Sequence, residues 1–147
     1  MRYLTPDAKT SVLGEWQHRI DNAPRTDLTE GCLGGHGGVD APMIDQCAQI
    51  NALPGVVTLQ SCTGHVRQSD LGQYVLPGQL WLWFDEATAR VVYETITDLP
   101  AWYEQPRLMW QASGQEVLDL RWSPTRRAED ACGALIDWLG AICEAAR

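Results

Sequence analysis

The stretch Gln79-Leu80-Trp81-Leu82-Trp83-Phe84-Asp85 decides the fold, because it predicts a strand that runs directly into a helix. Side chains alternate between the two faces of a strand, so the two tryptophans share one face while Leu82 and Phe84 occupy the other. Asp85 is a suitable N-cap for a helix that extends to about residue 98. We therefore expect a sheet with helices packed on it.

Further elements are expected on both sides of this stretch. β-Branched or alternating segments predict strands over residues 56–59, 108–112 and 116–122. Apolar residues at helical spacing predict helices over residues 6–21, from Asp40 to about residue 53, and from Ser123 onward.

Together these elements predict the architecture. The order of helices and strands favours an α+β fold, a mixed β-sheet with helices packed on it. Residues 67–78 are expected to form a connecting loop, and Ser113-Gly114 a hairpin turn. We expect a single compact domain over residues 1–147.

Composition and charge restrict the partners. The chain has 11 basic and 19 acidic side chains and a formal net charge of -8. Long nucleic acids need clustered positive charge, so the composition argues against DNA and against tight binding of tRNA. No apolar run reaches the roughly 18 residues of a membrane helix, and the N-terminus lacks the apolar segment of a signal peptide. We expect a cytoplasmic protein without a membrane partner, and a homo-oligomer is compatible with the sequence.

The positions of the cysteines indicate core residues rather than a framework of disulfide bonds. They occur at positions 32, 47, 62, 132 and 143, an odd number without a Cys-x-x-Cys pair. This spacing is typical of neither a disulfide framework nor a structural zinc site, and it favours a reducing compartment. Cys47, Cys132 and Cys143 fall on apolar positions of expected helices, where cysteine packs as a small hydrophobic residue. We expect these three in the core, and no metal site.

Two polar stretches are candidates for ligand binding. Residues 34–40, Gly-Gly-His-Gly-Gly-Val-Asp, lead into a helix, where backbone N–H groups and the helix dipole favour an anion. They can also be interpreted as a flexible loop capped by Asp40. The stretch Ser61-Cys62-Thr63-Gly64-His65 follows a strand, and ligand sites gather where strands end. Alternatively, it holds a nucleophilic Cys62 that is activated by His36 or His65.

Taken together, the two stretches resemble the tRNA wybutosine-synthesising methyltransferase family, which acts third in that pathway. The family has a Lys-Gly-Ser/Thr-Val/Ile-Asp stretch, a helix, and then Thr-Thr-Ser-Ser-Cys-Ser-Gly-Arg at similar spacing. The corresponding residues are 36–40 and 61–65, and the firm resemblance covers residues 36–66. Residues 79–85, residues 116–122 and the C-terminal helix resemble the family more loosely.

The resemblance implies a pocket shared by both stretches and an adenosine-type ligand. In the family this ligand is S-adenosylmethionine (SAM), used to methylate a guanine-derived base of a tRNA. The family's lysine is His36 here and its closing arginine is His65, so basic groups that would hold a tRNA are missing. The residues expected to bind the ligand are His36, Gly37, Gly38, Asp40, Ser61, Cys62, Thr63, Gly64, His65, Trp81 and Trp83.

The two tryptophans in this set have two interpretations. Indole rings in a pocket can stack on a purine base. A face that carries Trp81 and Trp83 can equally well pack against a helix. Arginines suit phosphate oxygens, and the candidates for that contact are Arg67, Arg121, Arg126 and Arg127.

Three functions follow from these features. The first is a protein that binds, and in one version sequesters, a small nucleotide or adenosine-type ligand, such as a virus-encoded trap for a signalling nucleotide. The second is a SAM-dependent N-methyltransferase that acts on a tRNA guanine-derived base or on a small substrate. The third is a cysteine hydrolase that uses Cys62.

Overall fold

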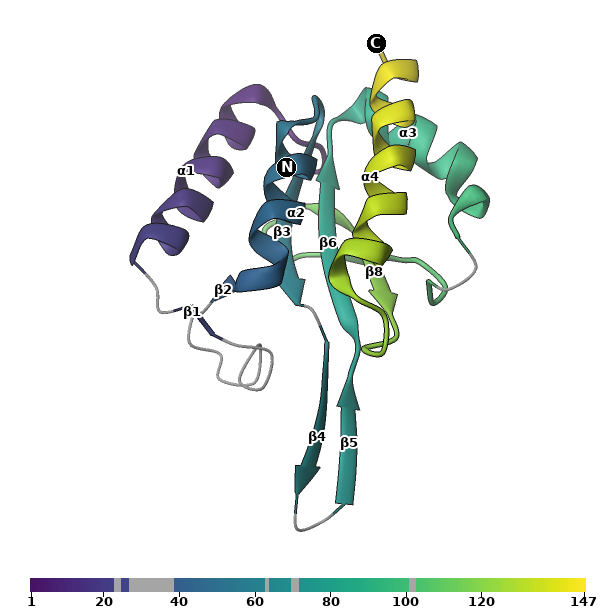
Figure 1. Ribbon diagram of the computed structural model, residues 1–147. Helices are drawn as coiled ribbons and strands as arrows, with labels where there is room; N and C mark the ends of the chain where they lie inside the picture. The colour runs from purple at the N-terminus through teal and green to yellow at the C-terminus, as the bar shows by residue number, and fades with distance from the viewer. Residues whose placement is uncertain (23–24, 27–38, 63, 70–71, 101–102) are drawn as a thin grey trace.

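The computed structural model describes residues 1–22, 25–26, 39–62, 64–69, 72–100 and 103–147 (Figure 1). Its elements are, in chain order, α1 (Pro6–Asn22), β1 (Arg25–Thr26), β2 (Val39–Asp40), α2 (Ala41–Ala52), β3 (Val56–Cys62), β4 (His65–Ser69), β5 (Gly72–Leu76), β6 (Gly78–Phe84), α3 (Glu86–Thr95), a 3-10 helix (Ile96–Asp98), β7 (Arg107–Trp110), β8 (Glu116–Trp122) and α4 (Ala128–Ala145).

Four strands form the central sheet in the order β3-β6-β8-β7. Every neighbouring pair in this sheet is antiparallel, so the α+β class is confirmed but the sheet is not mixed. Strands β7 and β8 are joined by a short turn, and such hairpin links force neighbours to run in opposite directions. A separate two-residue pair, β1 with β2, is parallel.

Strands β4 and β5 form an antiparallel ribbon that continues β3 and β6 away from the sheet (Figure 1). The expectation of a connecting loop over residues 67–78 is therefore wrong. Val66, Tyr74 and Val75 are residue types that favour strands, and they decide the local structure despite the polar residues between them. The short strand expected over residues 56–59 likewise extends to Cys62.

Helices pack on both faces of the sheet. Helices α2, α3 and α4 cover the face of Leu80, Leu82 and Phe84, and together they form the larger hydrophobic core. On the opposite face, Val57 and Trp83 pack against α1 and the N-terminal segment. No helix in the described ranges is both long and apolar enough to cross a membrane.

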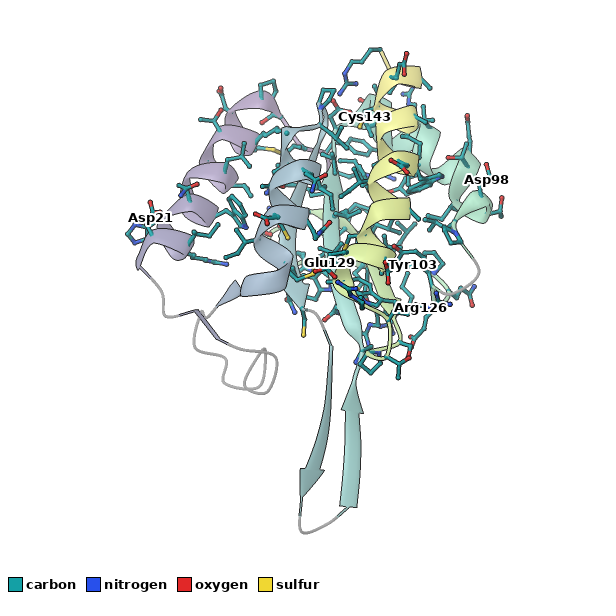
Figure 2. All side chains as sticks on the ribbon, viewed as in Figure 1. Asp21, Asp98, Tyr103, Arg126, Glu129 and Cys143 are labelled. Atoms are coloured by element: carbon teal, nitrogen blue, oxygen red, sulfur yellow. The ribbon has the colours of Figure 1, made fainter. Side chains whose placement is uncertain are left out.

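Most of the helix starts and core cysteines that the sequence predicts are found in the structure. Asp85 accepts a hydrogen bond from the Thr88 backbone N–H at 2.8 Å and caps α3, as expected. Helix α4 begins at Ala128 rather than Ser123, because residues 123–126 form a turn first. Cys47, Cys132 and Cys143 are confirmed as buried core residues, and burial raises the pKa of Cys132 to about 12. Figure 2 shows Cys143 on α4.

The N-terminal segment is fastened to the end of the sheet. The Leu4 backbone N–H donates to the Phe84 carbonyl at 2.8 Å, and the Trp83 indole N–H donates to the Arg2 carbonyl at 2.9 Å. The Arg2 guanidinium also forms an ion pair with Glu116. The Glu116 carboxylate accepts a second hydrogen bond, from the hydroxyl of Tyr93. Burial acts to raise the pKa of Glu116, but these two hydrogen bonds outweigh it and hold that pKa below its usual value.

Gly78 is expected to be intolerant of a side chain, because it lies against the buried indole of Trp122. A Cβ at Gly78 would stand 2.1 Å from Trp122 Cε2. Gly78→Ala should lower the free energy of unfolding by about 1–3 kcal/mol, measured by urea denaturation, because the core must shift to accept the methyl group. Gly133→Ala in α4 is the control: its Cβ meets nothing within 4 Å, and stability should hold or rise by up to about 1 kcal/mol. Equal losses in both variants would contradict this account.

Candidate functional site

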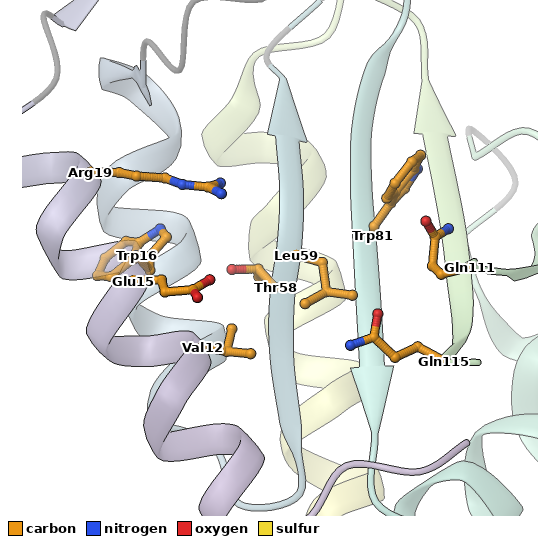
Figure 3. Close-up of a pocket in the computed structure, with 9 residues that line it drawn as sticks. All are labelled: Val12, Glu15, Trp16, Arg19, Thr58, Leu59, Trp81, Gln111 and Gln115. Atoms are coloured by element: carbon orange, nitrogen blue, oxygen red, sulfur yellow. The ribbon is translucent and has the colours of Figure 1, made fainter. Parts of the chain in front are cut away.

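A groove of about 290 Å³ lies between α1 and the face of the sheet that α1 partly covers (Figure 3). One wall is α1, which contributes Val12, Glu15, Trp16 and Arg19. These positions are three or four residues apart, so they share one face of the helix. Figure 3 shows the side chains of Glu15 and Arg19 reaching from the helix toward the sheet. The groove therefore has one aromatic and two charged side chains on its helical wall.

The other wall is the sheet, with Leu59 of β3, Trp81 of β6 and two glutamines from the β7–β8 turn. Trp81 is half-buried, and its indole N–H has no hydrogen-bond partner among the described residues. This N–H has no exposed surface, as is also true of the unpartnered N–H of Trp122 in the core, so Trp81 offers the groove its ring rather than its N–H. The two glutamines, Gln111 and Gln115, add amide donors and acceptors at one end of the groove.

Trp81 belongs to a row of side chains that crosses all four strands. Gln60, Trp81, Asp119 and Arg107 stand opposite one another in β3, β6, β8 and β7. Residues opposite one another in antiparallel strands point to the same face, so this row lies on the groove side of the sheet. A β-bulge between Thr58 and Gln60 sets the register of β3 in this row.

Asp119 organises the polar end of this face. Its side chain is completely buried, and its carboxylate accepts hydrogen bonds from Gln79 Nε2 at 2.9 Å, Arg107 Nη2 at 2.9 Å and Arg121 Nε at 3.1 Å. Two guanidinium groups thus share one carboxylate. A buried carboxylate needs such partners to offset the loss of its hydration.

A second groove, of about 270 Å³, lies where α1, α3 and the C-terminal residue meet. Its charged groups already bond to the protein: Lys9 donates to the Leu53 carbonyl, and Arg147 pairs with Asp85 at 3.1 Å. Burial lowers the pKa of Lys9. Because these contacts use its charged groups, this groove is the weaker candidate.

The structure separates the two tryptophans expected at the site. They lie on one face of β6, as the alternation predicts, but Trp83 is buried in the core against α1 and its N–H is used by the Arg2 carbonyl. Trp83 is therefore packed in the core with almost no exposed surface, and its expected role in ligand binding stays a prediction. Trp81, two positions earlier, lines the groove.

The stretch from Ser61 to His65 is not a simple loop. Ser61 and Cys62 end β3, and His65 begins β4. Between them, Gly64 adopts a φ of 86°, a conformation that favours glycine, and its N–H donates to Cys62 Sγ at 3.4 Å. Cys62 is buried and disulfide-bonded, which corrects two expectations. Its thiolate is not free to act as a nucleophile, and the cysteine pattern no longer supports a reducing compartment.

Several expected ligand residues lie outside the described part of the chain. These are His36, Gly37, Gly38 and Thr63, together with the side chains of Asp40 and His65. The backbone of Asp40 is described as the last residue of β2, directly before α2. A cavity shared by residues 36–40 and 61–65 therefore stays a prediction.

Sequence reasoning missed the α1 wall and the Asp119 cluster. Trp16 reads as an ordinary core residue from its helical spacing, although it is only partly buried. The presence of Glu15 and Arg19 beside it on the helix was the available signal. Arg121, a phosphate candidate from the sequence, lies two residues from Asp119 on β8, but the other two partners come from β6 and β7 and no local pattern links them to Asp119.

Comparisons with known proteins bear on the fold alone. No family model matches the chain, and no curated protein is similar to it in sequence. The chain is similar to the structure of the PH1069 protein from Pyrococcus horikoshii, with a TM-score of 0.50 and 12% sequence identity over 95% of this chain and 87% of that one. This similarity supports the α+β arrangement described above.

Asp119 is expected to be important for stability. Asp119→Asn removes the charge that holds two arginines, and it should lower the free energy of unfolding by about 1–3 kcal/mol in urea denaturation. Glu129→Gln, which breaks an exposed ion pair with Arg127, is the matched control and should change stability by less than about 0.5 kcal/mol. A silent Asp119→Asn variant would refute this role.

Cys62 is expected to resist alkylation until the protein is reduced. In denaturant without reductant, iodoacetamide should modify Cys132 and Cys143, which are free thiols, and leave Cys62 unmodified. Added reductant should make Cys62 reactive as well. Peptide mass spectrometry measures each site, and alkylation of Cys62 in unreduced protein would show that the disulfide is absent.

Proposed function

We propose that the protein binds a small nucleotide-type ligand, with a flat heteroaromatic base, in the groove between α1 and the sheet. The observation that carries this proposal is the position of Trp81. Its half-buried ring lines the groove, and the opposite wall carries Trp16 and Arg19. A flat base suits the two indole rings, and an anionic group suits Arg19.

The sizes and energies suit such a ligand. The volume of about 290 Å³ lies near the lower end of the roughly 300–1,000 Å³ typical of small-molecule sites. Stacking of a base on an aromatic side chain contributes about 1–3 kcal/mol. The guanidinium of Arg19 is exposed and can meet a phosphate oxygen with two parallel N–H groups.

The resemblance to the wybutosine-synthesising methyltransferase family supports an adenosine-type ligand. The second of the two resembling stretches begins at Ser61 in β3, the strand that contributes Thr58 and Leu59 to the groove. A ligand in this groove would thus lie beside that stretch. The net charge of -8 favours a small ligand over a long nucleic acid, because a nucleotide needs only one or two cationic contacts.

Calorimetric titration with ATP, adenosine and SAM tests the proposal. Trp81→Leu should weaken the binding of the tightest of these probes by about tenfold or more, because it removes the stacking surface. Trp138→Leu is the matched control: Trp138 lies on α4 and packs against the core on the other side of the sheet. It should change the affinity less than about twofold. Failure of all three probes to bind, or equal effects of the two variants, would refute the proposal.

The fate of the ligand separates a binder from an enzyme. A binding protein should release the probe intact when it is denatured, as measured by mass spectrometry. Conversion of SAM to S-adenosylhomocysteine in the presence of a substrate would instead favour the methyltransferase alternative.

A further inference from the structure

We infer that Arg107 and Arg121, held side by side by Asp119, form a phosphate-binding subsite next to Trp81. The inference deepens the proposed function and rests on it for the position of the base. It makes the ligand a phosphorylated nucleotide, which distinguishes it from SAM, whose sulfonium and ammonium groups carry positive charge.

The charges of Asp119, Arg107 and Arg121 do not cancel. One buried carboxylate meets two guanidinium groups, so the cluster retains a net charge of about +1. In the described part of the chain, neither arginine forms an ion pair with any other carboxylate. One guanidinium and the Gln79 amide would be enough to partner Asp119. The second arginine is therefore in excess of what the buried carboxylate needs.

Both arginines are partly exposed to solvent. The side chains of Arg107 and Arg121 are 54% and 33% exposed, while that of Asp119 is fully buried. A guanidinium has five N–H donors, and the contacts with Asp119 use one from each arginine. The remaining donors can meet phosphate oxygens. Because Asp119 fixes both side chains, less conformational entropy is lost when an anion binds.

The two arginines lie on the same face of the sheet as Trp81. Asp119 stands directly opposite Trp81, and Arg107 stands opposite Asp119 on the next strand. Neighbouring strands are about 5 Å apart, so the backbone of Arg107 on β7 lies two strand spacings, roughly 10 Å, from that of Trp81, and Arg121 lies on the strand between them. That separation is similar to the distance between the base and the 5′-phosphates of a nucleotide. A base stacked on Trp81 can therefore direct its phosphates toward the cluster.

Calorimetry with ATP, adenosine, SAM and inorganic pyrophosphate tests the subsite. Arg107→Gln and Arg121→Gln, made singly so that Asp119 keeps one guanidinium, should each weaken ATP binding by about tenfold or more. Adenosine binding should change less than about twofold. Arg90→Gln is the matched control, because it removes the same charge from an exposed ion pair on α3 and should leave all affinities unchanged.

The outcomes separate this inference from the proposed function. Unchanged ATP affinity in both arginine variants would overturn the subsite. Equal weakening of ATP and adenosine would also overturn it, because the loss would then reflect a general structural effect. In a third outcome, adenosine fails to bind while pyrophosphate binds to the wild-type protein and not to Arg107→Gln. That result would support the phosphate subsite and refute the base-binding groove. Thermal unfolding of each variant confirms that it is folded at the temperature of the titration.

Discussion

The last three side chains of strand β6, Leu82 to Phe84, are buried on alternate faces of the sheet, and this constraint fixes where the other elements can pack. Leu80, Leu82 and Phe84 need a cover on one face, which α2, α3 and α4 provide. Trp83 needs a cover on the other, which α1 and the N-terminal segment provide. Where a central strand carries apolar side chains on both faces, helices on one side of the sheet alone would leave the other face exposed to water.

The two faces differ in how completely they are covered, and the candidate site follows from that difference. Helix α1 packs beside β3 and leaves Trp81 at the border between packed and open surface, where the groove forms. Beyond Trp81 the same face becomes polar, with Asp119 at its centre. A helix over this region would have to bury two arginines. The polar residues thus keep part of the sheet available to a ligand.

The disulfide at Cys62 changes how the second polar stretch must be viewed. Cys62 stands opposite Gln79, which itself donates to Asp119, so the stretch is attached to the polar face through β3. A covalent cross-link at this point restrains the end of the strand where the ribbon of β4 and β5 departs. A disulfide-bonded sulfur is not a nucleophile, so the contribution of Cys62 is to the stability of this part of the fold.

The sequence by itself determined the local features of the protein: the alternation in β6, the cap at Asp85, the three core cysteines and the α+β class. Each depends on residues close together in the chain, whose spacing can be read directly. Only the tertiary structure decided the antiparallel order of the sheet, the cross-link of Cys62, the division of roles between Trp81 and Trp83, and the meeting of Asp119 with two arginines. These depend on strand order and register, which bring distant residues within hydrogen-bond distance and leave no pattern in any single segment.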